Sequence, residues 1–485
     1  MALDDIRKER EKKLAALKEK GLDPYPAVSR RHLRISEVAE DFLRYNGSEV
    51  TVAGRVMAKR EQGGVAFADL RDGSGKIQLL LKADVLDETS RFVFENMDIG
   101  DIVEVSGKGM VTKRGEKSVE VSRLSMLSKT LLPLPDKWHG LVDIEERLRR
   151  RYVDLIMNPE ERELFRKKSH FWQATRDFLL KEGFLEVETP ILEPTTGGAD
   201  AEPFVTHLNA LNIDLYLRIS PELHLKRLLV GGYEKVFEIG RIFRNEGIDR
   251  EHLQDYTQME VYWAYADYEM MMEMVERMVK HVMQETLGTL SHEWQGQMID
   301  WSGAWPRIDY YKVFQKNTGI DLASVSSVEL QSYAEREGID VTDHPGRGRL
   351  IDVIFKKKVR PTLIQPGFLV LPPIDVVPLA KRHREDPLRG ERLQIVACAT
   401  ELGTGWSELN DPLDQRVRFE EQVQMREAGD REAQMMDEDF VEALEYGMPP
   451  AAGFGYSERF FAVITNRTVR ELVFFPIMRP RRSEP

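Results

Sequence analysis

The stretch between residues 49 and 127 constrains the fold more than any other part of the sequence, because apolar and polar residues alternate there. Five segments show this alternation: EVTVAGRVMAKR, GVAFADLRD, KIQLLLKAD, DIVEVSGKGMV and KSVEVSRLSML. A period of two places every second side chain on one face, so each segment predicts a strand with one buried face. Residues 72–75 (DGSG) predict a tight turn, and residues 85–97 predict a short helix before the fourth strand. This order predicts a small β-barrel.

A barrel of five strands with a helix after the third is typical of the OB-fold, which binds oligonucleotides, although other small barrels also fit the pattern. We assign residues 46–130 to this barrel and residues 1–45 to a helical arm. Within the arm, residues 4–20 predict a helix that ends at Gly21. Two interpretations of this helix stay open, namely a solvated helix and a basic arm that binds a phosphate backbone.

The charge of the chain is unevenly distributed. The formal net charge of the 485 residues is −13, which by itself disfavours a nucleic-acid partner. Residues 1–140 nevertheless carry 25 basic and 23 acidic side chains, a net charge of +2, which leaves −15 for the remainder. The first part can therefore tolerate a polyanion, and the second repels one unless its basic residues are grouped.

Several classes of protein are excluded by composition. No apolar run approaches the ~20 residues that span a bilayer. The N-terminal residues show no apolar signal core, so we expect a cytoplasmic protein. The single cysteine, Cys398, excludes an internal disulfide framework and a cysteine-rich zinc site.

The remainder of the chain predicts a second domain. Residues 131–142, rich in proline and glycine, predict a linker. Helices are predicted over 160–182 and 267–287, the latter with methionines as core filler. FLEVETPIL (184–192) predicts a strand, and strands are expected again from 347 onward. Residues 143–485 therefore predict an α+β domain on an antiparallel sheet, with a mainly helical insertion around 265–345.

The densest group of polar residues lies at 241–262, RIFRNEGIDREHLQDYTQMEVY. Arg244 and Glu246 share one face of a strand by their even spacing, and Tyr256, Glu260 and Tyr262 share one face of the next. Two antiparallel strands would therefore present these side chains on one surface. The alternative is a solvated face with charges paired across strands.

Three further segments combine glycine or charge with a defined spacing. TELGTGWSELND (400–411) places Glu401 and Glu408 around a glycine turn, which also fits a simple hairpin. In GFGYSER (453–459), a glycine pair precedes Arg459 at the start of a helix, an arrangement that favours an anion. In SPELHLKRL (220–228), Glu222 and Lys226 are one helical turn apart, which by itself predicts an ordinary surface pair.

These clusters, in this order behind an OB-like domain, resemble the class II aminoacyl-tRNA synthetases, and most specifically the bacterial-type lysyl-tRNA synthetases. The resemblance extends from about Leu3 to Pro480. The long helix with FLEVETPIL resembles motif 1, FRNE through His252 to Tyr256 resembles motif 2, and GFGYSER resembles motif 3. Further segments close to this specificity are LPLPDKWHGL, RRRYVDLI, GGADAEPF, PELHLKRL, MEVYWAYADY, SELND and FFPIMRP.

The resemblance implies that the chain activates lysine with ATP and Mg²⁺, and transfers the lysyl group to the 3′-terminal adenosine of tRNA(Lys), as a cytoplasmic homodimer. It implies Arg244 and Arg459 as catalytic residues. The ATP-binding residues that it implies are Arg244, Glu246, Arg250, His252, Tyr256, Glu401 and Arg459. The lysine-binding residues are Gly198, Glu222, Glu260, Tyr262, Thr404 and Glu408. Glu401 is the implied metal ligand, with Gln394 at a second metal position, and the implied anticodon-binding residues are Arg55, Phe67 and Gln78.

The sequence departs from the family pattern at four places. Motif 3 is one residue short, Gln394 stands where a metal-binding glutamate is common, Thr404 stands at a position that is usually asparagine, and Cys398-Ala399 replace a glycine pair. These departures motivate one alternative, a tRNA-binding paralogue with weakened catalysis. The other alternative is a related synthetase of the aspartate or asparagine type, which Glu260 and Glu408 oppose. Within the barrel, Phe67 is either a base-stacking residue or a core residue.

Overall fold

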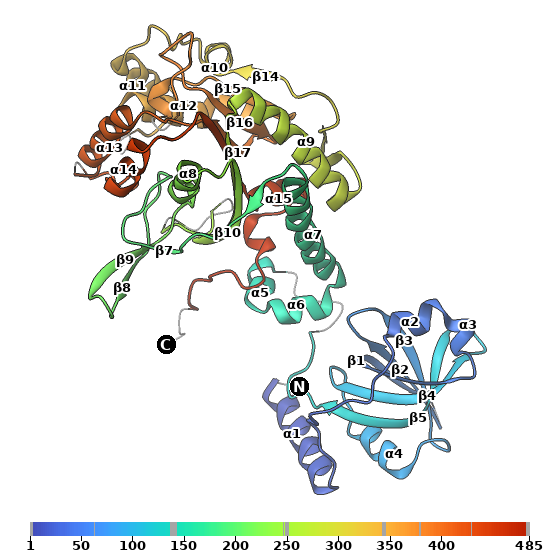
Figure 1. Ribbon diagram of the computed structural model, residues 1–485. Coiled ribbons are helices and arrows are strands. Elements are labelled where there is room, and N and C mark those ends of the chain that lie inside the picture. Colours follow the sequence, from blue (N-terminus) through green and yellow to red (C-terminus); the bar gives the residue numbers. More distant parts are fainter. Residues whose placement is uncertain are drawn as a thin grey trace. The chain divides into compact units, whose positions relative to one another are not determined.

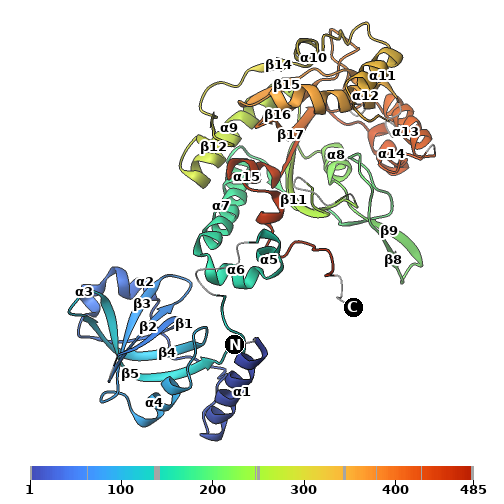
Figure 2. The same ribbon diagram turned by 180° about the vertical axis from the view of Figure 1, so that it is seen from behind.

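The computed structural model describes residues 3–62, 64–135, 143–245, 247, 252–341, 346–377, 380–427 and 429–481. The chain divides into two compact units, Met1–Asp143 and Ile144–Pro485, and Figures 1 and 2 show the elements of each from two sides. Residues 136–142 of the predicted linker lie outside the described residues. The finer domain boundaries given above stay predictions.

The first unit is a closed five-stranded barrel with the strand order β1-β2-β3-β5-β4. Its strands are β1 (Glu49–Gln62), β2 (Val65–Arg71), β3 (Lys76–Lys82), β4 (Ile102–Val111) and β5 (Lys117–Ser128). Helix α4 (Glu88–Glu95) follows the third strand. The predicted barrel, with its helix after the third strand, is therefore confirmed.

The arm before the barrel packs onto it. Helix α1 (Leu3–Glu19) buries Leu17 in the hydrophobic cluster of the barrel, together with residues of α2 (Ile35–Glu40) and α3 (Phe42–Tyr45). Arg10 donates hydrogen bonds to the carbonyls of Ile99 and Leu132, so one basic residue of α1 stabilises the unit itself. The helix is thus docked on one side and is not solvated all round.

The second unit is built on an eight-stranded sheet with the order β14-β15-β16-β17-β18-β11-β10-β6. All neighbouring strands are antiparallel except the outermost pair at each edge, β14 with β15 and β10 with β6. This confirms the predicted α+β domain on an antiparallel sheet. The strands are β6 (Leu185–Glu186), β10 (Lys235–Phe243), β11 (Asp255–Ala264), β14 (Arg307–Asp309), β15 (Gly367–Val370), β16 (Arg392–Ala397), β17 (Thr400–Ser407) and β18 (Ala451–Ser457).

One face of the sheet is covered by α7 (Pro159–Lys181), α9 (Tyr268–Leu287) and α15 (Arg459–Ile464), which share its main hydrophobic cluster. Phe171 and Phe178 of α7 are buried there, as the apolar face of the predicted helix requires. Met271, Met274 and Met278 of α9 are also buried, which confirms the methionines as core residues. The opposite face of the sheet is left to α8 (Glu222–Val230) and α14 (Glu438–Glu445), and to the site described below.

Two sequence expectations are wrong. Residues 347–354 form helix α12 (Arg347–Ile354), and the next strand begins only at Gly367; Leu350, Ile351 and Ile354 bury one helical face. FLEVETPIL forms no single strand, because Pro190 separates β6 from β7 (Leu192–Glu193), which pairs in a different sheet.

The remaining α-helices and β-strands are α5 (Ile144–Arg149), α6 (Arg151–Met157), β8 (Val205–Leu208), β9 (Ile213–Leu217), β12 (Ser291–Trp294), β13 (Gln297–Asp300), α10 (Tyr310–Thr318), α11 (Ser327–Arg336) and α13 (Pro412–Glu427). In the described part of the chain, no helix is both long enough and apolar enough to cross a membrane.

Candidate active site

Two adjoining cavities open on the sheet face that α7, α9 and α15 leave uncovered. Their volumes are about 380 Å³ and about 910 Å³. Both are lined by Arg244, Tyr256, Glu401 and Arg459, so these four side chains stand where the cavities meet.

The smaller cavity is shaped by strands β11 and β18. Along β11, Met259 and Val261 enter the core, whereas Glu260 and Tyr262 face the cavity, as their even spacing predicted. Gly453 of β18 lies opposite Tyr262. A Cβ atom on Gly453 would lie 2.3 Å from Oε1 of Glu408, so only glycine leaves room for that carboxylate.

Three carboxylates gather in this cavity, and we call them the acid pocket: Glu222, Glu260 and Glu408. Their exposed fractions are 3%, 5% and 1%. Carboxylates this deeply buried are costly unless cations or hydrogen-bond donors balance them. Their presence together therefore indicates a ligand with positive charge.

Glu260 is held by donors from two elements. Oε1 accepts hydrogen bonds from Ser220 Oγ (2.7 Å) and Gln258 Nε2 (2.6 Å), and Oε2 accepts one from the Tyr262 hydroxyl (3.0 Å). Burial and the nearby charge of Glu222 outweigh these donors and raise the pKa of Glu260 to about 7. Without a cationic ligand, this carboxylate is therefore poised between its neutral and charged forms.

Lys226 pairs with the other two carboxylates. Its Nζ lies 2.6 Å from Oε1 of Glu222 and 2.5 Å from Oε2 of Glu408. Burial lowers the pKa of Lys226, but the charges of the two glutamates outweigh it and raise that pKa above its usual value. Lys226 is only 1% exposed, so the expectation of an ordinary surface pair with Glu222 is wrong.

Glu408 has one engaged and one open oxygen. Trp406 Nε1 donates to Oε2 at 2.9 Å, the oxygen that also meets Lys226. Among the described residues, Oε1 has no hydrogen-bond partner although it is buried. A buried acceptor without a partner is costly. A hydrogen-bond donor of a ligand therefore gains the most binding free energy when it contacts Oε1.

The other predicted lysine-binding residues lie in the same cavity. Gly198 has a φ of +82°, and a Cβ there would lie 2.8 Å from the Cβ of Glu222, so the backbone approaches the pocket as only glycine allows. The hydroxyl of Thr404 accepts a hydrogen bond from Arg392 Nε at 2.9 Å. Thr404 is therefore already engaged by the protein.

Arg244 and Tyr256 mark the junction of the cavities. The guanidinium carbon of Arg244 lies 5.7 Å from the centroid of the Tyr256 ring, within cation–π range. Arg459, the first residue of helix α15, also lines both cavities. A planar group between these side chains would meet an aromatic ring and two guanidinium groups.

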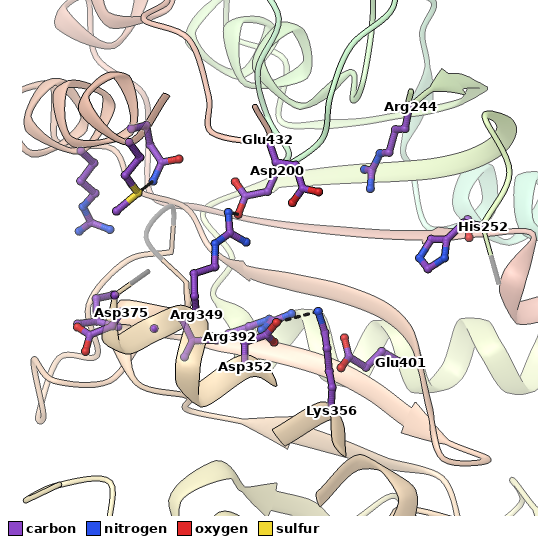
Figure 3. Close-up of a pocket in the computed structure, with 18 of the residues that line it drawn as sticks. Asp200, Arg244, His252, Arg349, Asp352, Lys356, Asp375, Arg392, Glu401 and Glu432 are labelled. Carbon is purple, nitrogen blue, oxygen red and sulfur yellow. Dashed lines mark hydrogen bonds and ion pairs between the residues drawn. The ribbon is translucent and has the colours of Figure 1, made fainter. Parts of the chain in front are cut away.

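Figure 3 shows the larger cavity, in which Arg244, His252 and Glu401 come from different strands and loops. The lining combines carboxylates, such as Asp200, Asp352 and Asp375, with basic side chains that can donate hydrogen bonds to phosphates. The basic side chains from the segment 346–392 and from α13 are Arg347, Arg349, Lys356, Arg382, Arg392 and Arg418.

Glu401 has Gln394 as its neighbour. The amide nitrogen of Gln394 donates to Oε2 of Glu401 at 2.6 Å. Within the described ranges, no three His, Cys, Asp or Glu side chains cluster closely enough to hold a metal ion.

All the described site residues predicted for the second unit line one or both cavities, whereas Glu246 and Arg250 lie outside the described residues. Those that the structure brings together are Gly198, Glu222, Arg244, His252, Tyr256, Glu260, Tyr262, Gln394, Glu401, Thr404, Glu408 and Arg459. Their binding roles stay predictions. Sequence reasoning missed three supporting residues: Ser220, Gln258 and Trp406. Gln258 and Trp406 could have been found, since each lies two residues before a predicted glutamate, a spacing that places both side chains on one face of an extended chain.

The three residues predicted to bind the anticodon, Arg55, Phe67 and Gln78, belong to neighbouring strands of the barrel. Ala66, Ala68 and Leu70 of β2 enter the barrel core, so the half-buried Phe67 between them faces outward. The alternative of a core residue is therefore wrong for Phe67. Gln78 accepts a hydrogen bond from Ser118 Oγ at 3.0 Å, and Arg55 donates one to the Gly100 carbonyl at 2.7 Å.

Comparison with known proteins identifies the relatives of this chain. Residues 143–479 match the family of class II tRNA synthetases (D, K and N), and residues 50–127 match the OB-fold nucleic acid binding domain. A lysine–tRNA ligase of Carboxydothermus hydrogenoformans is 46% identical over 483 residues, and one of Moorella thermoacetica is 47% identical over 485 residues, each covering 99% of both chains. The chain belongs to the lysine–tRNA ligase family.

A further lysine–tRNA ligase shows similar identity over nearly the whole chain. The lysine–tRNA ligase of Bacillus subtilis is 43% identical over 489 residues, covering 99% of this chain and 98% of that protein. The expected resemblance is confirmed, and so is the OB-fold barrel in front of a class II synthetase domain.

Proposed function

We propose that this chain is a lysine–tRNA ligase, which activates lysine with ATP and transfers it to the 3′-terminal adenosine of tRNA(Lys). The acid pocket is the observation that supports this substrate most strongly. Three buried carboxylates with one resident ammonium group leave an excess of negative charge. A second ammonium, brought by the side chain of lysine, compensates that charge.

The same charge disfavours the related amino acids. Asparagine would leave the carboxylates of the acid pocket desolvated and without a cation, which costs free energy. Aspartate would add a further negative charge to an acidic cavity. Glu260 and Glu408 would bind the ε-ammonium beside Tyr262, and Glu222 with the backbone at Gly198 would bind the α-amino group.

Activation requires alignment and no general base. A carboxylate oxygen of lysine attacks the α-phosphorus of ATP, the bond to the bridging oxygen breaks, and pyrophosphate leaves with the electron pair. Arg244 would hold the carboxylate and the α-phosphate together, because its planar fork donates to two oxygens. Tyr256 and Arg459 would enclose the adenine, Glu246 would accept from its amino group, and Arg250 with His252 would bind the outgoing phosphates.

Transfer completes the reaction. The hydroxyl of the 3′-terminal adenosine attacks the carbonyl carbon of lysyl-adenylate, loses its proton, and AMP leaves. Mg²⁺ would supply charge neutralisation on the phosphates, with Glu401 as its carboxylate ligand, because Mg²⁺ is commonly held by one or two carboxylates and substrate oxygens. Gln394 offers only an amide at the second position.

The barrel would read the anticodon. Phe67 faces outward on β2, where a base can stack on it, and Arg55 and Gln78 belong to the neighbouring strands. This assigns residues 46–130 to anticodon binding and residues 143–485 to catalysis. The barrel's near-neutral charge permits these local contacts with RNA.

The proposal includes a homodimer in the cytoplasm, where tRNA is charged. The apolar face of α7 packs within its own unit and gives no support to a dimer. Exposed leucines and an isoleucine lie in the last turn of this helix and after it instead, with exposed fractions of 42–49%: Leu180, Leu185, Ile191 and Leu192. Sedimentation of the full chain should give twice the monomer mass, and a monomer would contradict this part.

Pyrophosphate exchange tests the function. When each of the twenty amino acids is tested in turn, exchange should occur with lysine. The chain should then attach lysine to tRNA(Lys). Exchange with aspartate or asparagine and not with lysine would identify a related synthetase. Absence of exchange with all twenty, combined with retained tRNA binding, would identify a tRNA-binding paralogue.

A further inference from the structure

Lys226 is a cation of the protein itself inside a cavity that binds a cationic substrate. It lies in the first turns of α8 and is surrounded by Glu222 of the same helix, Glu408 after β17, and the ring of Phe440 on α14, whose centroid is 5.9 Å from Nζ. Both carboxylate contacts are buried, so water does not screen them. The ammonium therefore acts strongly on both glutamates.

The contacts of Lys226 determine which oxygens remain for a ligand. One oxygen of Glu408, Oε2, is taken by Lys226 and Trp406. The other, Oε1, faces the space above Gly453, where a Cβ would be 2.3 Å away. The contacts of Oε2 with Lys226 and Trp406 thus fix the Glu408 carboxylate, and Oε1 is the single acceptor that it presents to the cavity.

From this geometry we infer that Lys226 is a positioning residue for lysine selection: it places a positive charge between Glu222 and Glu408 and directs one oxygen of Glu408 toward the substrate's ammonium group. The inference rests on the proposed function as a lysine–tRNA ligase. Lys226 does not contact the reacting atoms; it acts through the two glutamates.

The charge balance supports this role. With Lys226, the three carboxylates of the acid pocket have a net charge of −2 when they are ionised, and lysine brings two ammonium groups. Without Lys226 the pocket would have a net charge of −3 in a buried space, and at least one carboxylate would take up a proton instead. A protonated carboxyl group attracts an ammonium far less.

The groups that face Glu408 set the direction of the pH effect. Lys226 and Glu222 approach from α8, and Tyr262 with Glu260 from β11. Burial raises the pKa of Glu408, Lys226 opposes this, and Glu222 raises it further, so that the balance leaves the pKa of Glu408 above its ordinary value even with Lys226 present. Loss of Lys226 removes the one cation among these neighbours, so the pKa of Glu408 must rise, and lysine binding must then require a higher pH.

The test compares Lys226→Met with Lys226→Arg in lysine-dependent pyrophosphate exchange across pH. For Lys226→Met we expect the lysine KM at pH 7 to rise about 10-fold or more, with the acid limb of kcat/KM for lysine displaced upward by about one pH unit. The ATP KM should stay unchanged. Lys226→Arg should keep the acid limb in place, because the charge is retained.

A control separates this effect from the general loss of a lysine side chain that contacts other residues of the second unit. Lys235 on β10 donates to the Glu182 carbonyl at 2.9 Å and lies 4.6 Å from the Trp263 ring, outside the cavities. Lys235→Met should leave both KM values and the acid limb unchanged.

The outcomes are separable. An unmoved acid limb in Lys226→Met, or parallel increases of the lysine and ATP KM values, would overturn the inference. If Lys226→Met does not fold, Lys226→Arg is the deciding variant. An acid limb of kcat/KM for lysine that is displaced although the charge is retained overturns the inference. An acid limb that stays in place while the lysine KM rises supports it. Absence of lysine exchange in the unmodified chain would instead contradict the proposed function.

Discussion

The Nζ atom of Lys226 lies 2.5 Å from Oε2 of Glu408, and both side chains are buried. This contact turns the remaining oxygen of Glu408 toward the cavity, where it has no partner among the described residues. The carboxylate is therefore fixed by the protein on one side and open to a ligand on the other. Such a fixed acceptor needs no rearrangement to meet an ammonium group.

The first prediction follows from this open oxygen. Glu408→Gln should raise the lysine KM about 100-fold, since removing one partner of a buried charge pair costs about 3 kcal/mol, and should leave the ATP KM nearly unchanged. Pyrophosphate exchange with each substrate varied in turn measures both constants. The exposed Glu420→Gln on α13 is the control. Equal increases of both KM values would show that Glu408 has no specific role in binding lysine.

The second prediction concerns stability and pH. The pKa of Glu260 is about 7 in the folded protein against an ordinary 4.5, so its neutral form is favoured by folding. Its contribution to the free energy of unfolding is fully present below pH 4.5 and is lost as the pH rises through 7. Glu260→Gln should therefore gain about 2–3 kcal/mol relative to the unmodified chain between pH 5 and pH 8.

Urea unfolding at the two pH values measures this gain. The exposed Glu293→Gln on β12 controls for the substitution itself. The same Glu260→Gln variant should lose lysine-dependent exchange at both pH values, so greater stability would accompany lost function. A stability difference independent of pH would contradict the raised pKa of Glu260.

The third prediction concerns the barrel. Phe67→Ala should raise the KM for tRNA about 10-fold to 100-fold, since one base stacked on an aromatic ring contributes about 1–3 kcal/mol. Lysine-dependent pyrophosphate exchange needs no tRNA and should be unchanged. Phe92→Ala on α4, another half-buried phenylalanine of the same unit, should leave the tRNA KM unaffected. Loss of exchange in Phe67→Ala would contradict a role restricted to tRNA binding.

The fourth prediction concerns the turn between β16 and β17. Cys398 and Ala399 have φ values of 54° and 56°, a left-handed conformation that disfavours side chains with a Cβ. Ala399→Gly should therefore stabilise the protein by about 1 kcal/mol. This value is the free energy of the relieved backbone strain minus the cost of the conformational entropy that glycine adds to the unfolded chain. Ala397→Gly, at a buried position of β16 without a positive φ, should destabilise it. Urea unfolding of both variants measures the difference, and a destabilised Ala399→Gly would contradict the strain.

The sequence was sufficient to predict elements whose pattern is local. The alternation along β2 predicted the strand itself but left the orientation of Phe67 open, and the helical repeat of Phe171 and Phe178 identified α7. It failed at residues 347–354, where Leu350, Ile351 and Ile354 have helical spacing in a stretch too short to be distinguished from a strand. Pro190 likewise ended one predicted strand and left two short ones in different sheets.

The role of Lys226 could not be predicted for a different reason. Glu222 and Lys226 have the spacing of any exposed helical pair, and their burial depends on Glu408 and Phe440, which come from distant parts of the chain. The open oxygen of Glu408 likewise depends on the pairing of β18 with β11, which brings Gly453 beside it. Only the assembled sheet shows that these groups share one buried space.

The central claim is that the acid pocket selects its substrate by the charge of the ε-ammonium group. Norleucine has a four-carbon side chain like that of lysine but lacks the ammonium group, so the two amino acids differ mainly in charge. Pyrophosphate exchange should proceed with lysine and be undetectable with norleucine at concentrations far above the lysine KM. Exchange with norleucine at a comparable kcat/KM would contradict the claim, because the buried carboxylates would then contribute nothing to substrate choice.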